Sequence, residues 1–333
     1  MNTNAGSSRQ RLDDLMQGYR AAQVIMTAER LQLFARLGTE SKTLEDLVTA
    51  TQASRRGLRM LCDALTALGF LEKSGASYAN TALSREFLLP ESETSQNALV
   101  RHGARLYERW GFLHDAVRSG RPVDDSKASL QLERNEADFA RAMASSAATQ
   151  AKETASRLDL SDAETLLDLG GGPGCYAIEF ARQYPRLTAV VLDRDETLKI
   201  AQARIDLAGL SSRICVRAGD ILESNWGGPY DVVFVSNVIH VFCAEDNERL
   251  ARKAASHLTS NGRLCLKDFV VQPDHTGPEW ACLFALNMLI NTADGDCYSS
   301  DEIQQWFKAA KLDFEREIEL NPPSRLLVAR KKS

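Results

Sequence analysis

A glycine-rich segment, Asp168-Leu-Gly-Gly-Gly-Pro-Gly174, follows an apolar run and precedes a helical pattern. Glycine lets the backbone turn tightly and come close to a ligand. The free N–H groups at the start of the next helix favour an electron-rich group. Residues 172–177 also fit the dinucleotide pattern G-x-G-x-x-A. A tight strand-to-helix turn without a ligand is the alternative, but three consecutive glycines cost chain entropy without adding packing.

Two acidic residues follow later strand-like runs. Asp193 ends the run at 188–192, and Asp220 follows the run at 214–217. A carboxylate at the end of the second strand can accept hydrogen bonds from both hydroxyls of a ribose. One acid after a strand is commonly a helix cap. Asp168 adds a third acid, beside the glycine loop that follows the first strand. Acids at the ends of three successive strands, together with a glycine loop, instead indicate a nucleoside site.

His240 follows the fourth strand-like run in the segment Ser236-Asn-Val-Ile-His240-Val-Phe. In an open parallel sheet, ligands bind at the carboxyl ends of the strands. We therefore expect His240 to lie close to the glycine loop, where an imidazole can act as a general base. A histidine packed against the sheet edge is the alternative.

The pattern of elements changes near residue 164. Beyond it, apolar strand-like runs alternate with segments long enough for crossover helices, which is the pattern of a parallel sheet covered on both faces. We predict an α/β catalytic domain at 106–333, with helices at 96–119 and 136–158 ahead of its sheet. The predicted strands are 165–169, 188–192, 214–217, 231–236, 263–269 and 325–329.

The region 1–105 has a different pattern, with helical spacing over 15–37 and 55–68 and a hairpin around Ser74-Gly75. This order resembles a winged helix-turn-helix. Arginines stand where a recognition helix would begin, so DNA binding is an alternative, although the segment is apolar and nearby acids dilute its charge. The wide apolar faces favour pairing with a second copy of the chain. The arginines are Arg55, Arg56 and Arg59.

Composition narrows the class of protein. The 333 residues suggest about two domains, and the net charge of −5 argues against a nucleic-acid partner. Seven scattered cysteines without a CxxC pattern favour reduced thiols in a cytoplasmic protein over a disulfide or zinc framework. We expect no metal site, no membrane-spanning segment and no signal peptide.

The glycine segment, Asp193 and Gly219-Asp220 together resemble the three nucleoside-binding motifs of class I S-adenosylmethionine-dependent methyltransferases. The whole chain resembles the O-methyltransferase family typified by the caffeate and acetylserotonin enzymes. The resemblance implies a Rossmann-like sheet, mostly parallel with an antiparallel last strand, behind an N-terminal winged-helix dimerisation domain. It implies S-adenosylmethionine as the cofactor, with Gly170, Gly171 and Gly172 on the methionine part, Asp193 on the ribose, and Asp220 and Ile221 around the adenine. Ser236 stands where the family often has a lysine or arginine that contacts the cofactor.

The family carries its general base in a His-Asp-Trp motif and flanks that base with two carboxylates. His240 matches the base, whereas Val241 and Phe242 replace the other two residues of the motif. Asp268 matches one flanking acid, and Cys297 stands where the other would fall. The resemblance therefore implies a catalytic histidine supported by one acid.

In this family, two helical segments line the pocket for an aromatic substrate. The matching segments in this chain are 139–143 and 284–291. Thioethers suit flat rings because they are polarizable, and amides on an apolar helix need polar partners. Ordinary core packing is the alternative for each residue. The candidate substrate contacts are Phe139, Met143, Asn287, Met288 and Asn291.

We predict a homodimeric enzyme that methylates a hydroxyl, phenolic in type, of a small aromatic or polyketide-like metabolite. Methyl transfer to carbon or nitrogen on the same scaffold is an alternative. A cofactor-binding relative with different chemistry is another, because the His-Asp-Trp motif is incomplete. The non-enzyme alternative is a winged-helix regulator that senses a ligand.

Overall fold

The structure is a computed structural model that describes residues 3–124 and 136–332, with side chains for 8–124 and 147–332. The chain divides into two compact units, residues 1–107 and 108–333. Each unit has its own hydrophobic core. No helix in the described part of the chain is long and apolar enough to cross a membrane.

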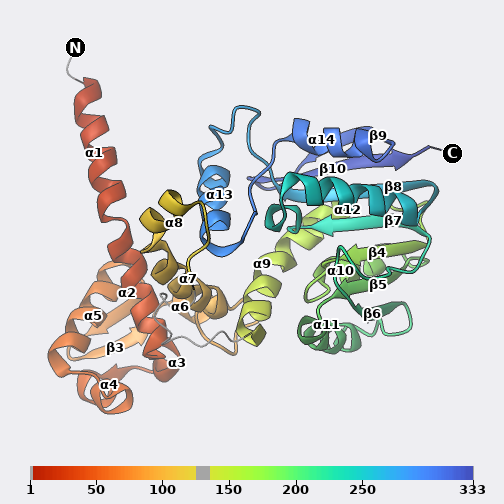
Figure 1. The fold of residues 1–333 in the computed structure, drawn as a ribbon. Coiled ribbons are helices and arrows are strands. Elements are labelled where there is room, and N and C mark those ends of the chain that lie inside the picture. Colours follow the sequence, from red (N-terminus) through yellow and green to blue (C-terminus); the bar gives the residue numbers. More distant parts are fainter. Residues whose placement is uncertain (1–2, 125–135, 333) are drawn as a thin grey trace. The chain divides into compact units, whose positions relative to one another are not determined.

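The N-terminal unit is mainly helical, with a three-stranded antiparallel sheet in the order β1-β3-β2 (Figure 1). Local sequence sets two helix starts. Thr43 and Asp46 form a capping box at α4, and the Ser54 hydroxyl accepts a hydrogen bond from the Gly57 N–H at 3.2 Å. The elements are α1 (Thr3–Gln17), α2 (Tyr19–Arg30), α3 (Leu33–Leu37), β1 (Lys42–Thr43), α4 (Leu44–Thr51), α5 (Arg55–Ala67), β2 (Leu71–Ser74), β3 (Ser77–Asn80), α6 (Ala82–Phe87) and α7 (Asn97–Trp110).

Two predicted helices are interrupted in the structure. The pattern over 15–37 contains α1, α2 and α3, and Gln32 adopts a left-handed φ of 53° at the last break. The pattern over 96–119 divides into α7 and α8 (Leu113–Ser119). Apolar spacing reports which side of a segment is buried, so it persists across a break when consecutive helices face the same core.

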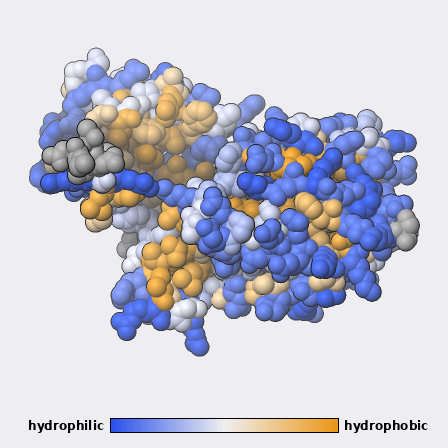
Figure 2. Space-filling model, turned by 90° about the horizontal axis from the view of Figure 1, so that it is seen from above, coloured by the Kyte–Doolittle hydropathy of each residue, from blue (hydrophilic) through white to orange (hydrophobic). Residues whose placement is uncertain are grey.

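The N-terminal unit keeps large apolar side chains exposed beside a well-filled core. Phe34, Leu58 and Leu65 are fully buried or nearly so, whereas Leu15 and Met16 on α1 are 65% and 67% exposed. Apolar surface is visible on the side that carries the N-terminal elements (Figure 2). An exposed apolar surface of this kind is characteristic of an interaction site.

The second unit is built on a seven-stranded sheet in the order β6-β5-β4-β7-β8-β10-β9 (Figure 1). The neighbours β6, β5, β4, β7 and β8 pair in parallel, and β10 pairs antiparallel with β8 and β9. The predicted mostly parallel sheet with an antiparallel last strand is confirmed. The strands are β4 (Thr165–Leu169), β5 (Thr188–Asp193), β6 (Ile214–Ala218), β7 (Tyr230–Ser236), β8 (Leu258–Phe269), β9 (Leu312–Glu319) and β10 (Ser324–Lys331).

Helices cover both faces of this sheet. The core on one face joins α9 (Glu136–Arg157), α10 (Cys175–Gln183) and α11 (Asp195–Leu207) to the strands. The core on the other face includes α12 (Ala244–His257) and α14 (Ser300–Ala309). Successive strand residues alternate between the two cores, as in Leu166 and Leu167. Between β7 and α12 lies the short helix η1 (Ile239–Val241), and α13 (Glu279–Asn291) follows β8.

The strand β9 was not predicted from the sequence. It lies at the edge of the sheet, and its sequence LDFEREIE carries five charged residues after Leu312 that are exposed or only partly buried. An edge strand with one solvated face lacks the apolar run of a central strand, and charged edges also discourage pairing with other chains.

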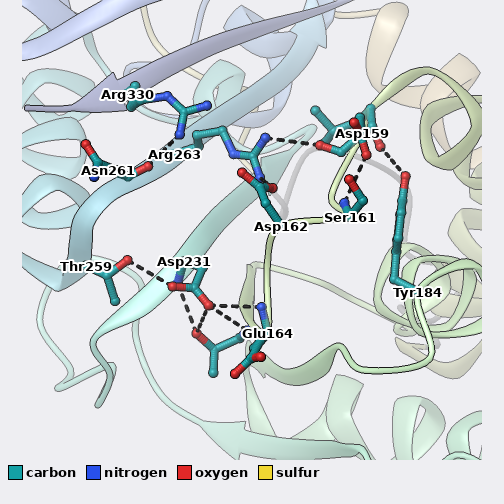
Figure 3. A network of polar contacts seen from close by, with 12 residues as sticks. Asp159, Ser161, Asp162, Glu164, Tyr184, Asp231, Thr259, Asn261, Arg263 and Arg330 are labelled. Carbon is teal, nitrogen blue, oxygen red and sulfur yellow. Dashed lines mark hydrogen bonds and ion pairs between the residues drawn. The ribbon is translucent and has the colours of Figure 1, made fainter.

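Polar contacts join strands at the amino end of the sheet, opposite the carboxyl ends (Figure 3). The Asp231 carboxylate accepts hydrogen bonds from the backbone N–H groups of Glu164 and Thr165 and from the Thr259 hydroxyl, each at 3.0 Å. Burial raises the pKa of Asp231, but the hydrogen bonds outweigh burial and lower it. The start of β4 is thereby tied to β7 and β8.

Candidate active site

The glycine loop between β4 and α10 packs tightly against the sheet. A Cβ atom at Gly170 would lie 2.6 Å from the Val238 side chain, and one at Gly171 would lie 2.7 Å from Asp168 Cγ. Gly172 differs, because a Cβ atom there would meet nothing within 4 Å. Gly170 and Gly172 also have φ values of 67° and 54°, which favour glycine. The loop is therefore pressed onto the sheet at Gly170 and Gly171 and faces open space at Gly172.

Asp193 is tied to this loop from the end of β5. Its Oδ2 accepts a hydrogen bond from the Gly172 N–H at 2.8 Å, and its Oδ1 accepts one from the Arg194 N–H at 2.7 Å. The side chain is half-buried. The structure thus places the predicted ribose acid beside the open part of the loop.

Asp220 and Ile221 lie in the turn after β6. Asp220 Oδ1 accepts hydrogen bonds from the Leu222 and Glu223 N–H groups, both at 2.8 Å, so it shapes the turn. The Ile221 side chain is half-buried and would lie 3.1 Å from a Cβ atom at Gly170. The predicted adenine residues therefore border the same loop as the ribose acid.

His240 forms a buried pair with Asp268. His240 is 8% exposed and lies in η1, and its Nδ1 is 2.7 Å from Asp268 Oδ1 at the end of β8. An ionised carboxylate only accepts hydrogen bonds, so a neutral imidazole beside it carries its proton on Nδ1 and keeps a lone pair on Nε2. Asp268 Oδ1 also accepts the Phe269 N–H at 2.8 Å, which fixes the carboxylate. The arrangement orients an imidazole as a proton acceptor.

Three aromatic rings extend from His240. The imidazole meets the Phe284 ring edge-on at 5.0 Å between centroids and stacks on Phe269 at 6.1 Å. Phe284 in turn stacks on Trp280 at 5.0 Å with an interplanar angle of 11°. Trp280 is 46% exposed, so the aromatic cluster runs from the buried His240 to the surface. Such rings pack favourably against another flat ring.

The other predicted substrate residues have mixed settings. Met288 is buried, with a 6% exposed side chain. Asn287 Oδ1 accepts hydrogen bonds from Trp110 Nε1 at 3.0 Å and from Asn291 Nδ2 at 3.1 Å. Trp110 belongs to the second unit, so both amides have partners within that unit. The side chains of Phe139 and Met143, on α9, lie outside the described residues.

Cys297 is fully buried. Burial raises the pKa of its thiol, and the nearby charges of Asp268 and Asp296 raise it further. The thiol is therefore neutral and cannot act as a second anion beside the base. The seven cysteines form no disulfide among the described residues, which also contain no group of histidines, cysteines and acids that could hold a metal ion.

Ser236 ends β7 with a buried hydroxyl that has no hydrogen bond of ordinary geometry in the described part of the chain. Its neighbour across the sheet is Lys267 of β8. Lys267 is only 1% exposed, and its pKa falls to about 8 because burial disfavours the charged form. Sequence reasoning missed Lys267, because a lone lysine in a strand gives no signal until the packing around it is known.

The comparisons with known proteins identify the family of this fold. Residues 110–312 match the O-methyltransferase domain, and residues 13–90 match the O-methyltransferase dimerisation domain. The chain belongs to the O-methyltransferase family. This methyltransferase is 29% identical to the 3-hydroxy-5-methyl-1-naphthoate 3-O-methyltransferase of Streptomyces sahachiroi, over 94% of this chain and 92% of that protein. It is also 29% identical to the acetylserotonin O-methyltransferase of Mus musculus, over 86% and 80% of the two chains.

Solved structures agree with this family. PigF with SAH has a TM-score of 0.87 at 25% identity and covers 97% of this chain and 99% of its own. Human N-acetylserotonin methyltransferase in complex with SAM shares the fold, with a TM-score of 0.86 at 24% identity over the whole of both chains.

The residues present fit a bound S-adenosylmethionine. The open space at Gly172, beside the Asp193 carboxylate, suits a ribose at the loop. Asp168 is fully buried, and its Oδ1 has no hydrogen-bond partner among the described residues. Burial raises the pKa of Asp168 to about 7. A cationic ligand group near the loop would favour the ionised form of this carboxyl.

Proposed function

We propose that this methyltransferase transfers the methyl group of S-adenosylmethionine to a phenolic hydroxyl of a small aromatic or polyketide-like metabolite, with His240 as the general base. The observation that carries the proposal is the buried His240–Asp268 pair, with Nε2 available and aromatic rings beside it. Two relatives support the substrate class by name, the 3-hydroxy-5-methyl-1-naphthoate 3-O-methyltransferase and the tetracenomycin polyketide synthesis 8-O-methyl transferase TcmO.

The chemistry determines what His240 has to do. When bound, S-adenosylmethionine supplies a sulfonium methyl group for in-line displacement. A phenol with a pKa near 10 and an imidazole near 6.5 are mismatched by roughly 3.5 units, so complete proton transfer beforehand would cost about 5 kcal/mol. His240 Nε2 therefore takes the hydroxyl proton as the oxygen–methyl bond forms and the sulfur–methyl bond breaks. Asp268 holds the ring and stabilises the resulting imidazolium.

Positioning provides the larger share of the rate. General-base assistance is typically worth about 10²–10⁴-fold, whereas well-oriented groups reach effective molarities of about 10⁵–10⁸ M. Phe269, Phe284 and Trp280 are the side chains we assign to hold the flat ring in line. Met288, Asn287 and Asn291 are further candidate contacts on α13, and Phe139 and Met143 are candidates on α9.

The enzyme works as a homodimer in this proposal. We assign pairing to residues 1–105 and catalysis to residues 106–333. The exposed apolar side chains of α1 and the match of 13–90 to a dimerisation domain support the pairing role. Seven cysteines without a disulfide among the described residues fit the reducing conditions of the cytoplasm.

Mass spectrometry tests the proposed function directly. Purified enzyme is incubated with S-adenosylmethionine and a panel of phenols, together with anilines and carbon nucleophiles of matched ring size. We expect a gain of about 14 Da on phenols, located on oxygen by fragmentation, and a much slower gain with His240→Ala. Methylation confined to nitrogen or carbon would contradict the proposal, as would cofactor binding without methylation of any panel member.

A further inference from the structure

Lys267 is a buried cation at the carboxyl end of β8. Its Nζ donates hydrogen bonds to Gln150 Oε1 at 2.9 Å and to Asn237 Oδ1 at 3.1 Å. Both acceptors are neutral amides, and no ion pair to Lys267 lies within 4.0 Å in the described part of the chain. An ammonium group has three donors, so one donor remains for another partner. Burying a charge without a counterion is costly, which indicates that the partner is an anion.

The groups around Lys267 leave more hydrogen-bonding capacity unused. Its Nζ lies 5.7 Å from the centroid of the Tyr176 ring. Tyr176 is 5% exposed, and its hydroxyl faces that of Ser236, but neither makes a hydrogen bond of ordinary geometry with a described residue. Buried polar atoms are normally satisfied. Two hydroxyls and one ammonium proton thus lie near one another without a hydrogen bond of ordinary geometry to a described residue.

This place adjoins the glycine loop. Tyr176 is the second residue of α10, directly after the loop. Asn237, which holds Lys267, precedes Val238, the residue that packs on Gly170. Asn237 has a left-handed φ of 56°, a conformation that is costly for a non-glycine residue and is concentrated at functional sites. The side chains of Asp168, Ser236 and Lys267 lie on the sheet face covered by α9 and α10.

We propose that the Lys267 ammonium group binds the carboxylate of the methionine part of the cofactor. The ribose acid lies at β5 and the loop at β4, so the methionine part extends toward β7 and β8, where Lys267 lies. Asp168 provides an unpartnered carboxylate oxygen on the same face for the amino group of that zwitterion. The assignment rests on S-adenosylmethionine as the cofactor and not on the identity of the substrate.

The charges that face Lys267 are compatible with this role. Burial lowers its pKa to about 8, and the Asp268 and Glu153 carboxylates partly offset that effect. The Tyr176 phenol has a raised pKa and stays neutral, and Ser236 at the end of β7 and the adjoining Asn237 carry no charge. The Lys267 amine, with its pKa of about 8, is therefore mainly protonated at pH 7, and it loses its charge as pH rises through about 8. A bound carboxylate would favour the charged form.

Calorimetry with two ligands tests the proposal. The ligands are S-adenosylhomocysteine and its decarboxylated analogue, which differ only in the carboxylate. The wild-type enzyme should prefer the first, and Lys267→Met should weaken its binding by about 10- to 150-fold, the usual effect of losing a charged hydrogen bond. The affinity of Lys267→Met for the decarboxylated analogue should change little. Lys253→Met is the matched control, because Lys253 supports the adenine-side turn through the Leu222 and Ser224 carbonyls and should affect both ligands equally.

A pH series provides a second measurement. Between pH 7 and 9 the wild-type preference for the carboxylate should shrink, whereas Lys267→Arg, which stays charged, should keep it. If Lys267→Met does not fold, this wild-type series alone decides the question. An unchanged preference in Lys267→Met, or a wild-type preference constant with pH, would overturn the proposal. The proposal would also be overturned if the only effect of Lys267→Met were a higher KM for phenols that carry a carboxylate, because Lys267 would then bind the substrate.

Discussion

The backbone carbonyl of His240 lies directly against Gly295. A Cβ atom at Gly295 would collide with this oxygen and with the Thr292 hydroxyl, and it would lie 3.2 Å from the Val241 carbonyl. The loop between α13 and α14 therefore presses on the short helix that carries the base. Nothing in the sequence around Gly295 indicated this contact.

Gly295→Ala should therefore displace the short helix η1 that holds His240. Overpacking of this kind typically costs about 1–3 kcal/mol, so thermal unfolding should occur at a lower temperature. Turnover should fall while affinity for S-adenosylhomocysteine stays constant, because the glycine loop is not touched. Gly103→Ala is the control, since its Cβ would meet only Met26 Cε at 3.4 Å within a helix. Unchanged stability and turnover in Gly295→Ala would contradict this prediction and would mean that the loop moves to accommodate the added methyl group.

Asp193→Ala should weaken cofactor binding. The ribose hydroxyls would lose their acceptor, which typically costs about 1.5–3 kcal/mol, or roughly 10- to 150-fold in affinity. The Gly172 N–H would also lose its partner, which adds to the loss. Calorimetry with S-adenosylhomocysteine measures the effect. Asp195→Ala is the matched control, because Asp195 is exposed and pairs only with Lys199 at 3.7 Å among the described residues; equal affinities for the two variants would refute the role of Asp193.

His240→Ala should lower turnover by about 10²–10⁴-fold with little change in cofactor affinity. Asp268→Asn should lower it less, because Asp268 acts through the imidazole. The loss in His240→Ala should shrink for phenols of lower pKa, which need less help to lose a proton. Steady-state kinetics across a series of substituted phenols checks this dependence. A uniform loss across the series would indicate that His240 positions the substrate instead.

Cys297→Glu should change the pH dependence of turnover. A carboxylate in this buried position, near Asp268, would favour the charged imidazolium over the neutral base. The acid limb of the pH profile of kcat/KM should therefore move to higher pH. Cys297→Ser adds no charge and should leave the profile in place. A folded glutamate variant with the wild-type profile would mean that position 297 does not influence the base.

The enzyme should be a dimer through its N-terminal unit. Light scattering at micromolar concentration should give about twice the chain mass of 36.8 kDa. Introducing charge at two exposed α1 positions, Leu15→Glu with Met16→Glu, should shift the enzyme toward monomer, because an apolar interface does not tolerate unpaired charges. The same change at the exposed Leu207, on the sheet unit, serves as control. A monomeric wild-type enzyme would contradict the assignment.

Much of the site could be predicted because local sequence determines it. The glycine loop and the acid after β5 fall at strand ends, and a parallel sheet brings those ends together. The surroundings of Lys267 could not be predicted, because its partner Gln150 is 117 residues away. Asn287 similarly meets Trp110 across 177 residues, so its amide suggested a substrate contact when only the helix was considered. Side chains held by distant elements give no local pattern.

Lys267 and Asp268 are consecutive residues, and the pleat of β8 sends their side chains to opposite faces of the sheet. The two proposed roles thus share one strand end, with a spacing set by backbone geometry rather than by a flexible connection. Exchange of the segment 270–299 with that of another family member would therefore change the aromatic side chains beside the imidazole without moving either charge. Evolution can in this way alter which acceptor is methylated while the methyl donor stays in place.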